Sequence, residues 1–148
     1  MEFLANLHHK VIHFPTAFLL IYPFAEIAAF MTGKNFFIKF AGVILFIGTV
    51  GSLAAVFTGN QAFTFIKDWS GENLKIFESH QTFATITVWY FTALLILRTY
   101  LGIKKKLNKK ILSAFLILSL IGGYFIFQTA NYGGKIAKER IKISYLEF

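Results

Sequence analysis

Uncharged apolar runs divide the chain into four segments of similar length. Residues 40–58 contain no charged residue over 19 positions, residues 80–97 contain none over 18, and residues 111–134 contain none over 24. Another apolar segment, residues 11–31, is interrupted by a single charged residue, Glu26. A helix rises 1.5 Å per residue, so about 20 apolar residues cross the hydrocarbon core of a bilayer. The pattern predicts four transmembrane helices, at about residues 11–31, 38–59, 80–100 and 110–130.

Four consecutive spans predict an up-and-down arrangement. Successive helices then cross the membrane in opposite directions, and both ends of the chain lie on one side. We therefore expect an all-α protein, an integral membrane up-down four-helix bundle, in which the first and third helices are diagonal neighbours across the core. No internal repeat, linker or low-complexity segment is evident, so we take residues 1–148 as a single four-span membrane domain.

The composition agrees with a membrane protein and excludes several kinds of chemistry. Hydrophobic residues make up 56% of the chain and charged residues 15%, against roughly 25% charged residues in a typical soluble domain. A soluble enzyme of 148 residues could not bury so much apolar surface, so that class is excluded. The chain has no cysteine, which excludes disulfides, thiolate zinc sites, iron–sulfur clusters and c-type haem attachment. The N-terminus lacks the features of a secretory signal, so we expect the first span to be retained.

Basic residues, which give the chain a formal net charge of +8, indicate the side of the membrane that each connection faces. The densest basic segment joins the third and fourth spans and contains Arg98, Lys104, Lys105, Lys106, Lys109 and Lys110. Cytoplasmic connections carry an excess of Lys and Arg, so we expect this one to face the cytoplasm of a bacterial inner membrane. Both termini then face outward. Anionic lipid headgroups are the expected partners of the basic segment, and no nucleic-acid partner is expected.

All four histidines fall near one end of the predicted bundle. The first span begins close to His8, His9 and His13, and the third begins at His80. Imidazoles at equal depth on diagonal helices can approach one central group from opposite sides, as the two axial nitrogens of a six-coordinate haem iron do. His13 and His80 are the expected axial ligands, and His8 replaces His13 if the first span begins earlier. In the simplest alternative, the histidines only occupy the interface between membrane and water.

Small and polar residues nearby would fit a flat haem. Glycines that could leave room for the ring fall at matched depth on the second and fourth spans, at Gly48, Gly51, Gly122 and Gly123. Alternatively, these glycines only let neighbouring membrane helices pack closely. The residues expected to contact the haem propionates on the outer side are Lys10, Asn131 and Tyr132.

Two other uses of the ionisable residues are open. His9 and His13 are four residues apart on one helical face, a spacing that can grip zinc or copper, and the histidine of the third span could add a third nitrogen. Glu26 lies within the first span, where it could carry protons or bind a cation in a small transporter. It could instead pair with Lys39 or Arg98 near the inner surface, which is the interpretation we favour.

Residues 7–15, with the sequence LHHKVIHFP, resemble the opening of a bacterial family of four-span membrane proteins of unknown function. The family pattern is Leu-His-Pro, three apolar positions and His-Phe-Pro, and it includes a glycine pair after the last span, here Gly133-Gly134. His9 departs from this pattern, because the family usually has proline there. The resemblance covers nearly the whole chain and implies the four-span topology. Members of the family sometimes occur joined to Rieske-type domains or near redox proteins, which implies electron transfer by association.

These observations lead to one principal hypothesis and two alternatives. The principal one is a membrane-embedded subunit that binds one b-type haem near the outer leaflet. It would exchange electrons with a quinol, a cytochrome c or a Rieske-type protein as part of a membrane complex or homo-oligomer, because one haem at one depth cannot span about 30 Å. Such a subunit is not an enzyme on its own, although it can belong to an oxidoreductase complex. The alternatives are a small transporter or histidine-based metal-handling protein, and a structural accessory subunit.

Overall fold

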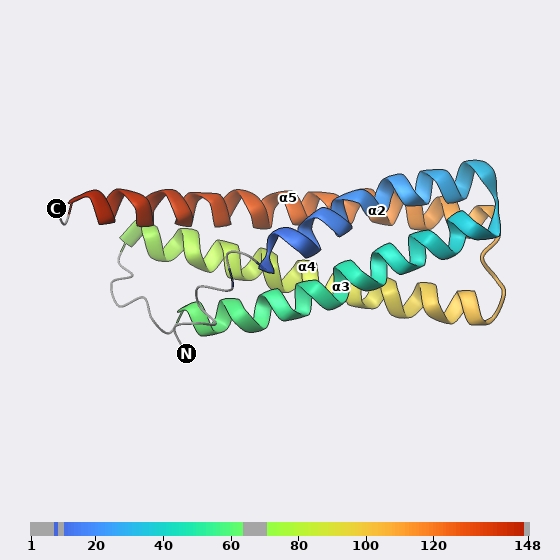
Figure 1. The fold of residues 1–148 in the computed structure, drawn as a ribbon, viewed down its shortest axis with the longest axis horizontal. Coiled ribbons are helices and arrows are strands. Elements are labelled where there is room, and N and C mark those ends of the chain that lie inside the picture. Colours follow the sequence, from blue (N-terminus) through green and yellow to red (C-terminus); the bar gives the residue numbers. More distant parts are fainter. Residues whose placement is uncertain (1–7, 9–10, 64–70, 147–148) are drawn as a thin grey trace.

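The described part of the protein consists mainly of four long helices (Figure 1). The computed structural model describes residues 8, 11–63 and 71–146. Within these residues the chain forms α2 (His13–Thr32), α3 (Asn35–Phe63), α4 (Gly71–Ile103) and α5 (Lys109–Leu146), and no strand. Each helix contains a stretch long and apolar enough to cross a membrane. The prediction of an all-α four-helix membrane bundle is confirmed.

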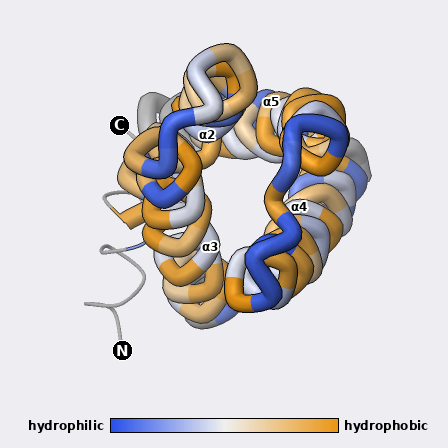
Figure 2. Tube along the Cα trace, turned by 90° about the vertical axis from the view of Figure 1, so that its right-hand side faces the viewer, coloured by the Kyte–Doolittle hydropathy of each residue, from blue (hydrophilic) through white to orange (hydrophobic). Residues whose placement is uncertain are grey.

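The helices form a ring in which each one packs against two neighbours (Figure 2). α2 packs most closely on α3, and α4 on α5, so the bundle consists of two helical hairpins. The hairpins meet where α2 packs on α5 and α3 packs on α4. Within the described residues, α2 does not pack on α4, and α3 does not pack on α5. The first and third spans are therefore diagonal neighbours, as expected.

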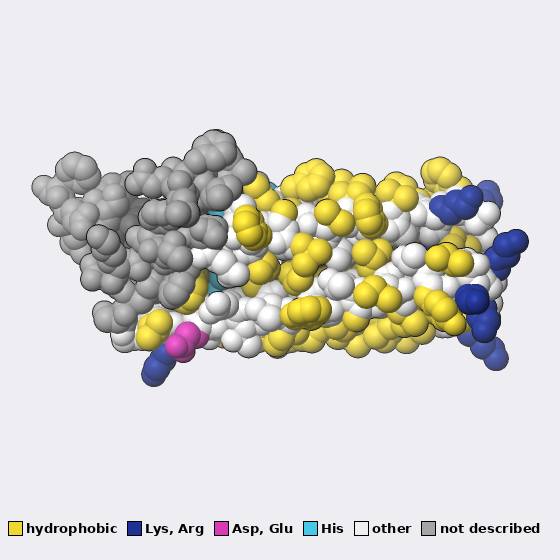
Figure 3. All heavy atoms as spheres, turned by 90° about the horizontal axis from the view of Figure 1, so that it is seen from below, with side chains coloured by type: hydrophobic (Ala, Val, Ile, Leu, Met, Phe, Trp, Pro, Cys, Tyr) yellow, Lys and Arg dark blue, Asp and Glu magenta, His cyan; other side chains and the backbone are white. Residues whose placement is uncertain are grey.

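Apolar side chains cover the outside of the bundle between two polar ends (Figure 3). Phe24 and Trp89 are each 70% exposed, and Phe127 is 66% exposed. In water such a surface would drive aggregation, whereas in a bilayer it contacts lipid tails. We call the end that carries the connections at residues 33–34 and 104–108 the lysine end. The opposite end, where α2 and α4 begin, is called the histidine end.

Local sequence explains the tight connections at the lysine end. α2 stops at Gly33, whose φ of +61° favours glycine and whose N–H donates to the carbonyl oxygen of Ala29 at 2.9 Å. α5 starts after Asn108, whose side-chain oxygen accepts a hydrogen bond from the N–H of Ile111 at 3.1 Å. A side chain that accepts in this way caps the first turn of a helix.

Helices α4 and α5 extend beyond the predicted spans at the histidine end. α4 begins at Gly71, well before His80, and α5 continues past the expected end near residue 130 to Leu146. Gly133 and Gly134, which the sequence places after the last span, lie inside α5, and neither has a positive φ. Glycine is compatible with a helix that its neighbours hold in place, and Gly133 packs against an imidazole of α4.

Close approaches at glycine hold each hairpin together. A Cβ atom at Gly48 on α3 would lie 2.6 Å from the side chain of Leu19 on α2. A Cβ atom at Gly122 on α5 would collide with the ring of Phe91 on α4. Leu19 is 2% exposed and Phe91 is completely buried, so both belong to the core. Small residues at these positions let the helix backbones approach closely.

A methyl group at Gly122 should destabilise the bundle, whereas one at Gly123 should not. Beside Gly122 the methyl meets the buried ring of Phe91, but a Cβ atom at Gly123 has no atom within 4 Å. Overpacking typically costs about 1–3 kcal/mol, whereas alanine in an open helical position gains up to about 1 kcal/mol over glycine. We expect Gly122→Ala to lower the melting temperature in detergent and Gly123→Ala to leave it unchanged or raised. Equal melting temperatures for the two variants would contradict the packing described.

Candidate functional site

A cavity of about 450 Å³ lies among all four helices at the histidine end. Its walls are mostly apolar and carry a few hydroxyl groups, such as those of Thr16, Ser52 and Thr87. His8, His13 and His80 border the same cavity. The site therefore brings together three of the four histidines of the chain. His9, the fourth, lies outside the described residues, as does Lys10.

His80 lies on α4 and is fixed by α5. Its Nδ1 atom donates a hydrogen bond to the carbonyl oxygen of Thr129 at 3.0 Å. A carbonyl oxygen can only accept, so Nδ1 carries the proton of the neutral ring and Nε2 carries the lone pair. The hydroxyl of Thr129 is also bonded, to the carbonyl oxygen of Phe125 at 2.9 Å and to the hydroxyl of Thr87 at 3.0 Å. The imidazole thus has a defined tautomer and a firm support.

His8 lies before α2 and is fixed by α3. Its Nδ1 atom is 3.0 Å from the hydroxyl oxygen of Thr58. That hydroxyl directs its only proton to the carbonyl oxygens of Ala54 and Ala55, at 3.1 and 3.0 Å. Toward His8 the Thr58 oxygen is therefore the acceptor, and Nδ1 of His8 carries the ring proton. His8 and His80 consequently have the same tautomer, with the lone pair on Nε2.

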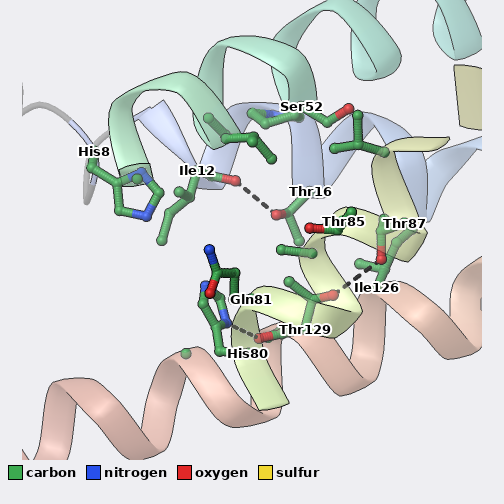
Figure 4. Close-up of a pocket in the computed structure, with 18 of the residues that line it drawn as sticks. His8, Ile12, Thr16, Ser52, His80, Gln81, Thr85, Thr87, Ile126 and Thr129 are labelled. Atoms are coloured by element: carbon green, nitrogen blue, oxygen red, sulfur yellow. Dashed lines mark hydrogen bonds between the residues drawn. The ribbon is translucent and has the colours of Figure 1, made fainter. Parts of the chain in front are cut away.

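His8 and His80 lie on opposite sides of the cavity (Figure 4). Their elements are diagonal neighbours, so the two rings approach the cavity from two directions. The rings are half-buried, whereas His13, the first residue of α2, is exposed. At the start of α2, Ile12 and Thr16 face the cavity. His8 occupies the same helical face as Ile12, whose N–H donates to the carbonyl oxygen of His8 at 3.1 Å.

The sequence assigns Gly48, Gly51, Gly122 and Gly123 to a flat cofactor. None of these four glycines borders the cavity. The space beside Gly48 is filled by Leu19, and a Cβ atom at Gly51 would lie 3.0 Å from Pro15. The alternative explanation, close helix packing, therefore accounts for Gly48, Gly51 and Gly122, whereas a Cβ atom at Gly123 would have no atom within 4 Å. Three other glycines border the cavity, Gly59, Gly133 and Gly134, and two of them approach a histidine ring. A Cβ atom at Gly59 would lie 2.9 Å from the ring of His8, and one at Gly133 would lie 3.2 Å from the ring of His80.

Two of the predicted propionate partners, Asn131 and Tyr132, do not border the cavity. Asn131 is exposed on α5 and does not border the cavity. Tyr132 stacks on Phe83, with ring centroids 5.6 Å apart, and the Nζ atom of Lys135 lies 5.0 Å from its ring centroid. The structure gives neither side chain a place at the site. Gln81, the residue after His80, borders the cavity instead and lies beside the imidazole in Figure 4.

A buried ion pair occupies the lysine half of the bundle. Nη1 of Arg98 on α4 donates to Oε1 of Glu26 on α2, and the two side chains are 3% and 0% exposed. Nη2 of Arg98 donates to the carbonyl oxygen of Ile38 on α3 at 3.0 Å, and its guanidinium lies 5.1 Å from the ring centroid of Phe115 on α5. This arginine of α4 therefore contacts the three other helices. Our favoured interpretation of Glu26, a pair with Arg98, is confirmed, whereas Arg98, which the sequence assigns to the basic connection, is buried inside the bundle.

The described residues offer no ready site for a metal ion held by protein side chains alone. In residues 8, 11–63 and 71–146, no three His, Asp or Glu side chains lie close enough together to bind one ion. Two imidazoles across a cavity supply opposed donors but not the three or four protein ligands of a zinc site.

Fold and site together define the class of this protein. It is a small multi-pass membrane protein, a four-helix bundle with a histidine-lined cavity at one end. The family model described as "Predicted membrane protein (DUF2231)" matches residues 4–141. The chain belongs to this family of predicted membrane proteins. No curated protein and no solved structure matches the chain.

Proposed function

We propose that the protein is a membrane-embedded electron-transfer subunit that binds one b-type haem in the cavity at the histidine end. The observation that carries the proposal is the pair of half-buried imidazoles, His8 and His80, on opposite sides of one cavity. Both have Nδ1 fixed by a hydrogen bond and the lone pair on Nε2. Metal-ligating histidines usually donate their other ring N–H to a protein oxygen, which sets the tautomer and ring orientation.

The residues present fit a haem in size and chemistry. The volume of about 450 Å³ falls within the roughly 300–1,000 Å³ typical of small-molecule and cofactor pockets. The walls are mostly apolar, as suits a porphyrin, and a few hydroxyl groups face the cavity. Most of these hydroxyls already donate to carbonyl oxygens of their own helix, as Thr16 does to Ile12 at 2.7 Å. They therefore leave the imidazoles as the strongest donors of electron pairs in the site.

We favour His8 over His13 as the second haem ligand beside His80, although the sequence alone favours His13. The ring of His8 is half-buried, packs against Gly59 and is supported by Thr58. His13 is exposed at the edge of the cavity. An axial ligand needs a fixed ring and a low-dielectric surrounding, and these conditions favour His8.

A haem bound here supplies reversible one-electron chemistry. His8 and His80 would hold it, and α3 and α5 orient these two imidazoles through Thr58 and Thr129. The lysine end suits the cytoplasmic surface, because it carries the densest basic segment, and the histidine end then faces outward. From there the subunit would exchange electrons with a quinol or an outer redox protein such as a cytochrome c or a Rieske-type protein. A single haem at one depth cannot carry electrons across the whole membrane, so further redox centres are needed. We therefore propose that the chain works within a membrane complex or a homo-oligomer.

Haem titration tests this proposal directly. Protein from haem-limited cells, purified in detergent, is titrated with haemin while the Soret band is followed. We expect saturation at one haem per chain and the low-spin spectrum of six-coordinate iron. Binding without a defined stoichiometry, or a high-spin five-coordinate spectrum, would contradict axial ligation by two histidines.

Removing the partner of the His8 ring should weaken haem binding. Thr58→Val keeps the side-chain volume but removes the oxygen that accepts from Nδ1. Loss of such a supporting hydrogen bond costs about 10–100-fold in metal affinity, so we expect the dissociation constant for haem to rise by about tenfold or more. Thr82→Val is the matched control, because the exposed Thr82 hydroxyl donates only to the carbonyl oxygen of Glu78. Equal affinities for the two variants would contradict a supporting role for Thr58.

A further inference from the structure

The two hairpins contain the same four contact positions at the same spacing. Eleven residues separate His8 from Leu19 on the α2 side, and eleven separate His80 from Phe91 on α4. The second helix of each hairpin carries two glycines that are also eleven residues apart, Gly48 with Gly59 on α3 and Gly122 with Gly133 on α5. Eleven residues make about three turns, so each pair shares a helical face.

The contacts made at these positions correspond in the two hairpins. Leu19 packs on Gly48, and Phe91 packs on Gly122. Three turns closer to the histidine end, His8 packs on Gly59, and His80 packs on Gly133. In both hairpins Nδ1 of the histidine also bonds to a threonine of the second helix, at 3.0 Å in each case.

The two hairpins differ mainly in the atom that accepts the hydrogen bond from Nδ1. His8 uses the hydroxyl of Thr58, the residue directly before Gly59. His80 uses the carbonyl oxygen of Thr129, one turn before Gly133. Each imidazole nevertheless has the same two supports, a glycine against the ring and an oxygen that accepts from Nδ1. The correspondence consists of contacts and not of similar sequence, so no internal repeat is evident along the chain itself.

We infer that the two hairpins are two copies of one half-site, and that Gly59 and Gly133 are its positioning residues. Each glycine has a hydrogen atom where other residues carry a Cβ atom, and one imidazole ring packs against it. This close contact holds the plane of the ring. A methyl group 2.9 Å from Cε1 of His8 requires that ring to shift, and one 3.2 Å from Cε1 of His80 requires a smaller movement of a few tenths of an ångström. The movement lengthens the bond from Nδ1 and turns Nε2 away from its present direction. The consequence for the cofactor rests on the proposed haem function, whereas the positioning of the rings does not.

Two alanine variants and one control test the inference. Gly59→Ala and Gly133→Ala add the methyl groups beside the two rings, and Gly123→Ala adds one to α5 in open space away from the cavity. The first readout is the ¹⁵N spectrum of imidazole-labelled histidine in detergent-purified protein without haem. We expect the Nδ1–H signal of His80 to shift or broaden in Gly133→Ala and that of His8 in Gly59→Ala. The Gly123→Ala spectrum should match that of the parent protein.

Haemin titration of the same three variants gives the second readout. We expect a rise of about tenfold or more in the dissociation constant for Gly59→Ala and for Gly133→Ala, and none for Gly123→Ala. The inference is overturned if the histidine signals of both cavity variants match those of the control. If the signals change but the parent protein binds no haem, the positioning role stands and the proposed function fails. A melting temperature measured for each variant separates movement of one ring from loss of the fold.

Discussion

His80→Ala is expected to reduce the affinity of the purified protein for haem by at least about a hundredfold. Loss of a supporting hydrogen bond already costs about 10–100-fold in metal affinity, and this variant removes the ligating nitrogen itself. The ring of His80 is half-buried, borders the cavity and is held by Thr129, so no other described histidine on α4 or α5 can replace it. The measurement is a haemin titration followed at the Soret band.

The remaining histidines provide both the matched partner and the control for this result. His8→Ala should weaken binding to a similar extent, because His8 supplies the opposite ligand. His13→Ala should retain haem, because His13 is exposed at the cavity edge. Loss of haem in His13→Ala together with normal binding in His8→Ala would restore the ligand pair that the sequence placed first. Normal binding by His80→Ala would contradict ligation at this site altogether.

Glu26→Gln is expected to lower the free energy of unfolding by about 3–5 kcal/mol, because it removes one partner of a buried ion pair. Arg98 would keep its charge among four helices, beside the Ile38 carbonyl oxygen and the Phe115 ring but without a carboxylate to balance it. The change is measured by unfolding in detergent with a denaturant. Glu78→Gln is the control, because Glu78 is exposed near the start of α4.

A double variant separates the ion pair from its individual charges. Glu26→Gln combined with Arg98→Met removes both buried charges and should be more stable than Glu26→Gln alone. If Glu26→Gln unfolds like the parent protein, the pair contributes nothing to stability. A functional role for Glu26, such as the proton carriage considered for a transporter, would then become the better explanation of its burial.

The fold could be predicted because long uncharged runs have few alternatives in a membrane. Every backbone polar group must be satisfied within the span, so runs of this length become helices. The ends of the helices were harder to predict, because α4 and α5 continue beyond the uncharged runs through residues such as Lys75 and Lys138. Polar residues outside the bilayer do not end a helix by themselves.

The site could be predicted only in part. Diagonal neighbours follow from four-helix topology, and in the structure His8, His13 and His80 border one cavity. Which N-terminal histidine faces the cavity depends on the helical face, and the sequence does not reveal where that face points before the helices pack. The glycines show the same limit. A glycine next to Leu19 and one next to His8 look alike in the sequence, and only the contacts distinguish them.

The most direct test of the central claim is the haem content of the protein as cells produce it. Protein purified in detergent from haem-replete cells is assayed by its reduced-minus-oxidised absorption spectrum and by pyridine haemochrome. We predict a b-type spectrum with a ratio near one haem per chain, lost in His80→Ala and retained in His13→Ala. Colourless protein from such cells, with no b-type signal on reduction, would contradict haem binding at the histidine end.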